Sequence, residues 1–333
     1  MSLEDQLVDE LKSGMCTLKR GLLIASGLDT EDKIQEYEDK IDYLDLEFER
    51  FLHKKSRFRR LLGIKNSDKY VANALFKFLW EGRYVYENDK FLTTDAIDAK
   101  IEGNDKIGNC VALTSLYTIL GLRHGLDVGV LASKTHVLNT LDDGNSSVLI
   151  ENTSTKGFNE STELIKDKLF KSRKSISLVA MVLSSLGGKK SKNEELDGAI
   201  KNYNKALEID SESENIYCNR AIAKIKLKDY TGAMQDCNKV LEIDPEYGKA
   251  YAVRGEIKIY IDDYAGAIKD LNKAFEIDSE DADIYNNRGI AKKGCGDYAG
   301  AIQDLNKAFE IDPGNELIKN NLEYIKKEAI KNV

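Results

Sequence analysis

The sequence is poor in residues that break helices and in residues that bind metals. Of its 333 residues only 2 are proline and 3 are histidine. Proline interrupts helices and strands, so its scarcity favours a largely helical chain. So few histidines argue against a histidine-rich metal centre. The sequence also shows no glycine-rich phosphate loop, and we expect neither a metal nor a cofactor.

Cysteine is also scarce, and its spacing excludes two further classes of protein. The 5 cysteines are odd in number and scattered, with no CxxC pair. This arrangement argues against a disulfide framework and against a structural zinc site. They are Cys16, Cys110, Cys218, Cys237 and Cys295.

Long apolar runs and strongly basic regions are missing as well. The longest apolar candidate, Ile176–Leu186, is interrupted by serines and is too short to span a bilayer. The acidic N-terminus does not resemble a signal peptide, so we expect a cytoplasmic protein with no membrane contact. From Glu195 onward the chain has 27 acidic and 20 basic residues, which argues against a nucleic-acid partner for this region. The sequence does not indicate an oligomeric state.

A period of 34 residues dominates the C-terminal half of the sequence. Three segments align at this period: Glu214–Tyr247, Gly248–Asp281 and Ala282–Asn315. Their second halves read DYTGAMQDCNKVLEID, DYAGAIKDLNKAFEID and DYAGAIQDLNKAFEID. A fourth unit ends ELDGAIKNYNKALEID at Glu195–Asp210 and has a degenerate first helix near Ser175–Leu186. Repetition at this period predicts stacked pairs of antiparallel helices.

Residues that recur at equivalent positions indicate how each unit is held together. Small residues recur where two helices must approach closely, as at Ala221, Gly255 and Gly289. Arginine at one position recurs with aspartate 16 residues later, as in Arg254 and Asp270, which predicts a salt bridge inside each unit. The amphipathic segment Glu316–Asn332 is typical of a helix that caps such a stack.

These repeats resemble the tetratricopeptide repeat (TPR) family. The resemblance implies an all-α superhelix whose groove binds a protein or peptide, with the groove formed mostly by the first helices. The carboxylate-binding version of this groove, known from the family, needs a dense set of Lys, Asn and Arg. In this chain few residues at the groove positions are of these types, and the set is mixed in character. We therefore do not assign that ligand. The groove residues implied by the resemblance are Asn219, Ile222, Lys226, Ala252, Glu256, Tyr260, Asn286, Ile290 and Lys293.

The first 170 residues have a different pattern. Helical spacing of apolar residues predicts helices at Ser2–Lys12, Thr30–Arg50, Tyr70–Trp80 and Val111–Arg123. Between Asp127 and Thr153 the period becomes strand-like, and Asp143-Gly144 predicts a hairpin turn. A further helix is expected at Glu160–Phe170.

Cys110 lies in a position that favours a reactive thiol. It follows Gly108 and Asn109 and immediately precedes an apolar helix. Asn109 is a good N-cap, so Cys110 would lie in the first turn. There the helix dipole favours a thiolate, and free backbone N–H groups could hold an oxyanion. An isolated cysteine is more often a small core residue.

The predicted hairpin supplies two possible partners for this thiol. If Asp143-Gly144 form a two-residue turn, Asp142 pairs with Asn145, Leu141 pairs with Ser146, and His136 lies opposite Glu151. A carboxylate there could orient the imidazole toward a thiol. A slip of one residue would bring Asn152 opposite His136, and asparagine can also orient an imidazole.

The order of Cys110, His136 and Glu151 resembles the transglutaminase-like (papain-like cysteine) α+β fold. With the repeats that follow, the chain looks most like the SirB-type family, which joins such a domain to TPRs. The resemblance implies Cys110 as nucleophile, His136 as base and Glu151, or alternatively Asn152, as the orienting residue. It implies a domain at residues 1–170, a linker with the degenerate first repeat helix at 171–194, repeats at 195–315 and a cap at 316–333.

Two classes of function remain open on the sequence. One is a thiol enzyme that cleaves, deamidates or transfers at amide bonds of a protein or peptide recruited by the repeats. The other is a non-catalytic adaptor that binds proteins through the groove. Retention of the nucleophile position, Cys110, favours the enzyme.

Overall fold

The computed structural model describes residues 3–13, 17–61, 68–80, 97, 110–132, 137–142, 147–150, 171–173 and 176–331. They divide into two compact units: residues 1–189 with 204–211, and residues 190–203 with 212–333. Helices α8 (Ser177–Lys192) and α9 (Leu196–Ile209) contribute residues to both units. Among the described residues, no helix is both long and apolar enough to cross a membrane.

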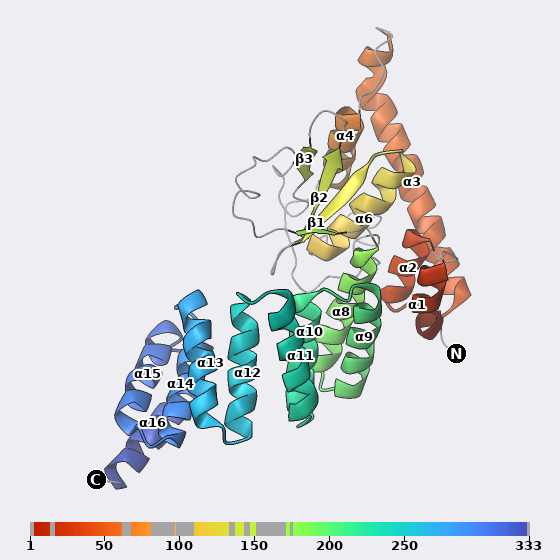
Figure 1. Cartoon of the computed structure of the whole chain (residues 1–333). Coiled ribbons are helices and arrows are strands. Elements are labelled where there is room, and N and C mark those ends of the chain that lie inside the picture. The colour runs from red at the N-terminus through yellow and green to blue at the C-terminus, as the bar shows by residue number, and fades with distance from the viewer. Residues whose placement is uncertain are drawn as a thin grey trace. The chain divides into compact units, whose positions relative to one another are not determined.

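The described part of the first unit combines helices with an antiparallel sheet of order β3-β2-β1-β4 (Figure 1). The edge strand β4 pairs with β1 and was not expected, because three residues are too few to show an alternating pattern. The helix α2 was also not expected, although Thr17 caps it by accepting a hydrogen bond from the Arg20 backbone N–H at 3.3 Å. The helices are α1 (Leu3–Ser13), α2 (Leu18–Ala25), α3 (Glu31–Leu61), α4 (Asp68–Trp80) and α6 (Cys110–Arg123). The strands are β1 (Val128–Ala132), β2 (Val137–Asp142), β3 (Ser147–Ile150) and β4 (Lys171–Arg173).

Helix α6 is the central element of the first unit. Every residue from Val111 to Gly121 is buried, and the helix packs against α2, α4, β1 and β2. A helix surrounded in this way must be apolar on all sides, which explains the sequence CVALTSLYTILGLR. Two of its polar groups are paired across the packing: the Tyr117 hydroxyl donates to the Ala72 carbonyl at 2.9 Å, and the Thr118 hydroxyl accepts from Asn139 at 2.9 Å.

The second unit contains the predicted helix pairs, each repeated after 34 residues. The first helices are α10 (Glu214–Lys226), α12 (Gly248–Tyr260) and α14 (Ala282–Gly294). The second helices are α11 (Tyr230–Ile243), α13 (Tyr264–Ile277) and α15 (Tyr298–Ile311). A last helix, α16 (Glu316–Lys331), packs on α14 and α15 and buries Ile318, Leu322 and Ile325.

Each second helix begins at the same capping residue. Asp229, Asp263 and Asp297 accept a hydrogen bond from the backbone N–H three residues later, at 2.9, 3.0 and 2.9 Å. The residue just before each cap is left-handed, with φ of 63° at Lys228, 60° at Asp262 and 84° at Gly296. The left-handed turn ends the first helix, and the aspartate satisfies a free donor of the second.

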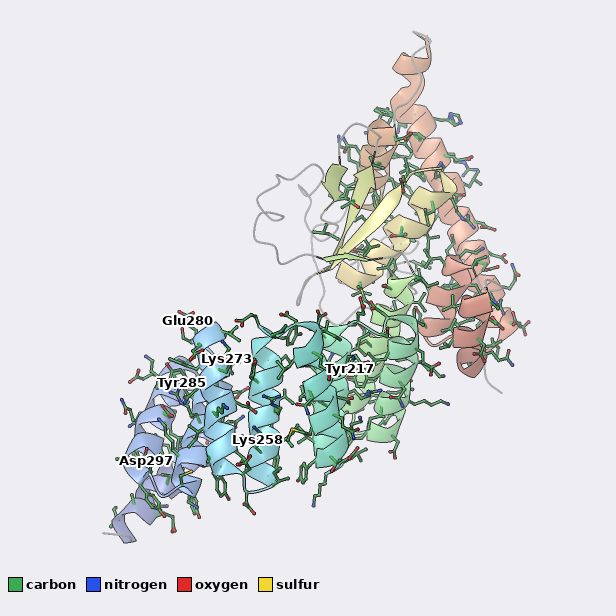
Figure 2. The ribbon with its side chains drawn as sticks, in the orientation of Figure 1. Tyr217, Lys258, Lys273, Glu280, Tyr285 and Asp297 are labelled. Atoms are coloured by element: carbon green, nitrogen blue, oxygen red, sulfur yellow. The ribbon has the colours of Figure 1, made fainter. Side chains whose placement is uncertain are left out.

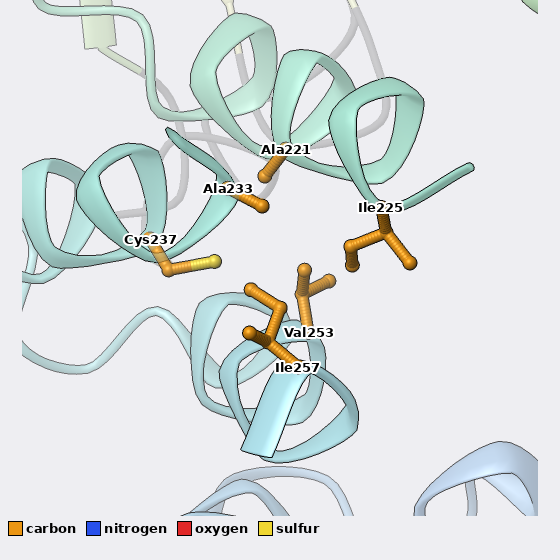
Figure 3. Close-up of a cluster of buried hydrophobic side chains, with 6 residues drawn as sticks. All are labelled: Ala221, Ile225, Ala233, Cys237, Val253 and Ile257. Atoms are coloured by element: carbon orange, nitrogen blue, oxygen red, sulfur yellow. The ribbon is translucent and has the colours of Figure 1, made fainter. Parts of the chain in front are cut away.

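Apolar side chains from consecutive helices form the core of the stack. In the cluster of Figure 3, Ala221 and Ile225 of α10 and Cys237 of α11 meet Val253 and Ile257 of α12. Cys237 is fully buried, as expected for a small core residue. Burial holds the pKa of its thiol well above the ordinary value, so this thiol is unreactive.

The predicted arginine–aspartate salt bridge is present in every complete repeat. Arg254 Nε and Nη2 both lie 2.8 Å from the two carboxylate oxygens of Asp270, and the equivalent forks join Arg220 to Asp236 and Arg288 to Asp304. A lysine completes each site, as at Lys258, whose Nζ lies 2.8 Å from Asp270 (labelled in Figure 2). These buried carboxylates are therefore fully paired inside their own repeats.

Candidate interaction surface and candidate thiol site

The helix contacts show which side of the repeat stack is concave. The first helices α10, α12 and α14 contact one another in this order, and the capping helix α16 contacts α14 in the same way. Over the same described stretch, α11, α13 and α15 make at most sparse contacts with one another. Elements that approach more closely lie on the inside of a curve, so the stack curves with its first helices on the concave side.

Helix α12 shows which side chains this concave side presents. Val253 and Ile257 point into the cluster shared with α11. Arg254 and Lys258 bind Asp270 of α13. A third stripe of α12 is made of Lys249, Ala252, Glu256 and Tyr260, which follow one another at helical spacing. Within it, Ala252 packs against the apolar cluster that α13 and α14 form.

The nine predicted groove residues differ widely in how accessible they are. Lys226 and Tyr260 are exposed, while Asn219, Ile222, Ala252, Glu256, Ile290 and Lys293 are half-buried. Asn286 is buried, and its side-chain oxygen accepts a hydrogen bond from Asn321 of α16 at 2.8 Å. Lys293 Nζ lies 5.4 Å from the ring centre of Tyr324, also in α16. The capping helix therefore already contacts the last repeat's share of this surface.

Glu256 differs from the buried aspartates that join the two helices of each complete repeat. Asp236, Asp270 and Asp304 each bind one arginine and one lysine. Glu256 has no hydrogen bond or ion pair among the residues that the structure describes. Burial raises its pKa, and the Asp283 carboxylate on α14 raises it further.

Tyr260 forms part of the same stripe and contacts Tyr230, a residue that the sequence did not indicate for this surface. Its ring stacks on Tyr230, the first residue of α11, with ring centres 5.3 Å apart and planes 11° from parallel. Tyr260 remains 53% exposed. The stacked pair therefore provides an exposed aromatic wall one helical turn from Glu256.

The hairpin of the candidate thiol site has a different register from the one predicted. Asp142 pairs with Ser147 and Leu141 pairs with Val148, so the predicted pairs of Asp142 with Asn145 and Leu141 with Ser146 are wrong. Four residues, not two, connect the paired positions. Because the partner shifts by two residues, every side chain keeps its face, and the apolar pattern cannot distinguish the two registers.

The proposed triad lies mostly outside the described residues. Cys110 is the first residue of α6, but its side chain, together with His136, Glu151 and the alternative Asn152, is not described. The described contacts nevertheless orient α6 against the sheet. Asn139 of β2 donates to the Thr118 hydroxyl at 2.9 Å, and Gly121 closely approaches Val128 at the start of β1.

These two contacts fix the direction of α6 relative to the strands. Moving from Gly121 back to Thr118 leads from the start of β1 toward the middle of β2. The first turn of α6 therefore points to the end of the sheet where β2 begins at Val137. Because Asn139 pairs with Ile150, β3 ends at this same edge.

Comparison with known families identifies the repeats. Family models described as TPR repeat match residues 192–228 and 255–294, and tetratricopeptide repeat models match residues 215–247 and 282–315. All these matches lie after residue 191. The segments they cover are tetratricopeptide repeats, as the 34-residue period predicts. A comparison with curated proteins gives no match.

Solved structures of repeat proteins are similar to part of the chain. MamA 41-end from Desulfovibrio magneticus RS-1 is 20% identical over 45% of this chain and 85% of its own, with a TM-score of 0.40. TTC0263, a thermophilic TPR protein of Thermus thermophilus, is 17% identical over 45% and 82%, with a TM-score of 0.43. The Arabidopsis OM64 TPR domain is 26% identical over 34% and 94%, with a TM-score of 0.33.

Proposed function

We propose that this protein is an interaction scaffold whose concave first-helix surface binds a protein or peptide segment. One observation carries the proposal. The second-helix sequences and the arginine–aspartate bridges recur closely from repeat to repeat, whereas the stripe of α12 differs in chemistry from its equivalents. The stripe position held by Glu256 is Ile222 and Ile290 in the other complete repeats. Variation at residues of the concave side is typical of a surface that recognises partners.

A displayed library of random peptides, selected on the full chain, tests this proposal. We expect selected peptides to lose binding when the exposed stripe residue Tyr260 is changed to Ala. The same peptides should bind normally when Lys307 on the second helix α15 is changed to Ala. Selection of no specific peptide, or equal losses from both variants, would refute a concave binding surface.

A thiol acyl-transfer activity is the second candidate function. In it Cys110 would attack an amide carbonyl and form a thioester, while His136 would deliver a proton to the departing amine. Glu151, or alternatively Asn152, would orient His136, and water or another amine would then take up the acyl group. The direction of α6 supports this candidate, because its first turn points to the sheet edge next to which residues 136 and 151 occur in the sequence.

Alkylation of individual cysteines tests the second candidate. Iodoacetamide at neutral pH, followed by peptide mass spectrometry, reports each thiol separately. We expect Cys110 to react much faster than the buried Cys218 and to slow when His136 is replaced by Ala. The exposed Cys295 is the matched control, since its rate should not depend on His136. A Cys110 rate that equals that of Cys218, or that ignores His136→Ala, would exclude the activity.

The domain limits predicted from the sequence form part of this proposal. They assign residues 1–170 to a transglutaminase-like domain and residues 171–194 to a linker with the degenerate repeat helix. Residues 195–315 would be the repeats and residues 316–333 the cap. The four-stranded sheet against α6 supports an α+β class for the first of these.

A further inference from the structure

Glu256 occupies a position at which the fold favours an apolar side chain. The equivalent residues of the neighbouring repeats are Ile222 and Ile290, and Ile222 packs on the buried cluster around Ala221. A half-buried carboxylate at this position costs free energy unless it is paired. Packing of the repeat therefore does not account for the glutamate.

No cation of the described array compensates Glu256. The lysine two residues later, Lys258, is already bound to Asp270 at 2.8 Å. The charged residue that most affects Glu256 is another acid, Asp283 of α14. The three buried aspartates that join the helices of each repeat, Asp236, Asp270 and Asp304, each have two cations. Glu256 therefore differs from them in its lack of a cationic partner.

The surroundings of Glu256 suit a long basic side chain. Ala252, one turn before it, is a half-buried apolar residue that packs against the cluster formed by α13 and α14. Tyr260, one turn after it, provides an exposed ring stacked on Tyr230. The methylene groups of lysine or arginine pack well on aromatic and apolar surfaces while their charge remains paired.

We propose that Glu256 receives a lysine or arginine side chain of the bound partner, with Tyr260 and Ala252 flanking its aliphatic part. The proposal rests on the scaffold function of the concave surface and specifies a basic segment as its ligand. Charge complementarity selects this occupant, since an acidic or purely apolar segment would leave Glu256 unpaired beside Asp283.

The same displayed library, selected on the full chain, tests the assignment. The selected peptides should share one lysine or arginine, and replacing it with norleucine should weaken binding about tenfold or more. Glu256→Gln should cause a similar loss. Glu276→Gln is the matched control, because Glu276 is an exposed acid on the opposite, second-helix side of the same repeat.

Three outcomes separate this inference from the scaffold proposal. Specific peptides without a shared basic residue, or with binding unchanged by Glu256→Gln, would overturn the role of Glu256 and leave the scaffold standing. No specific peptide at all would overturn both. Thermal unfolding of Glu256→Ile supplies a check on folding. We expect this variant to melt at or above the wild-type temperature, and a lower melting temperature would show that Glu256 is structural, which also overturns the proposal.

Discussion

The two helices of each repeat are matched in size where they touch, and this match can be tested quantitatively. In the second complete repeat, Gly255 faces Leu271, and in the third Gly289 faces Leu305. In the first repeat the equivalent residues are Ala221 and Cys237, which share one buried cluster. A larger residue on the first helix thus accompanies a smaller one on the second. We predict that the effects of Gly255→Ala and Leu271→Cys on the free energy of unfolding are not additive when the two substitutions are combined.

The structure gives the size of the expected effect. A Cβ on Gly255 would lie 2.7 Å from Leu271 Cγ and 3.1 and 3.3 Å from its two methyl carbons. Such overpacking costs about 1–3 kcal/mol, and alanine returns about 1 kcal/mol through its higher helix propensity. Gly255→Ala should therefore destabilise the array by about 0–2 kcal/mol. Leu271→Cys alone leaves a cavity worth about 2–3 kcal/mol.

In the double variant the new methyl group occupies part of that cavity. Its destabilisation should be smaller than the sum of the single effects by about 1–2 kcal/mol. Urea unfolding followed by circular dichroism gives the free energy of unfolding of the wild type, the two single variants and the double variant. The four values are compared if the slope of that free energy with urea concentration is the same for all of them. The matched control combines Gly255→Ala with Leu305→Cys, since these residues belong to different repeats. Effects of Gly255→Ala and Leu271→Cys that add to within about 0.5 kcal/mol would refute the reasoning.

Further predictions concern single residues. Lys228→Gly should stabilise the array by about 0.5–1 kcal/mol, because a left-handed residue costs more than glycine's extra chain entropy. Gly296→Ala should destabilise it by about 1 kcal/mol, and denaturation midpoints that shift the other way would contradict both. Burial alone would raise the pKa of Asp304, but hydrogen bonds from Arg288 and a lysine hold it below 3.8. Its contribution is present above that pH and is lost as the pH falls through the folded-state pKa. Asp304→Asn should thus cost about 3 kcal/mol at neutral pH and much less in acid, and a loss independent of pH would be inconsistent with the ion pair. The pKa of Glu256 is raised above 4.5, so the stability it contributes exists below that pH and is lost as the pH rises through the folded-state pKa. Glu256→Gln should therefore raise the melting temperature at neutral pH but not at about pH 3, and an equal change at both would argue against burial as the cause.

Recurrence made the repeat region predictable. Helix positions, the arginine–aspartate bridges and the core role of Cys237 all follow from comparing one repeat with the next, because equivalent residues have equivalent neighbours. The comparison does not supply contacts that only one repeat makes. The stacking of Tyr230 on Tyr260 and the hydrogen bond between Asn286 and Asn321 are of this kind.

The first unit offered no such internal comparison. Its strands between Asp127 and Thr153 and its central apolar helix follow from the pattern of the sequence, but the hairpin register does not. Pairings that differ by two residues bury the same faces, so the apolar pattern is equally satisfied by both. The short helix α2 and the strand β4 are too brief for a periodic signal.

The sequence by itself determined the 34-residue unit, the helices within it and the residues that pair inside it, since these depend on neighbours that recur at fixed spacing. Only the tertiary structure decided which residues of each first helix stay half-buried or exposed on the concave side, because that depends on where the neighbouring helices lie. The distinction matters most at Glu256. In the sequence it is one acid among many, and in the stack it is a half-buried carboxylate without the two cations that a buried aspartate such as Asp270 has.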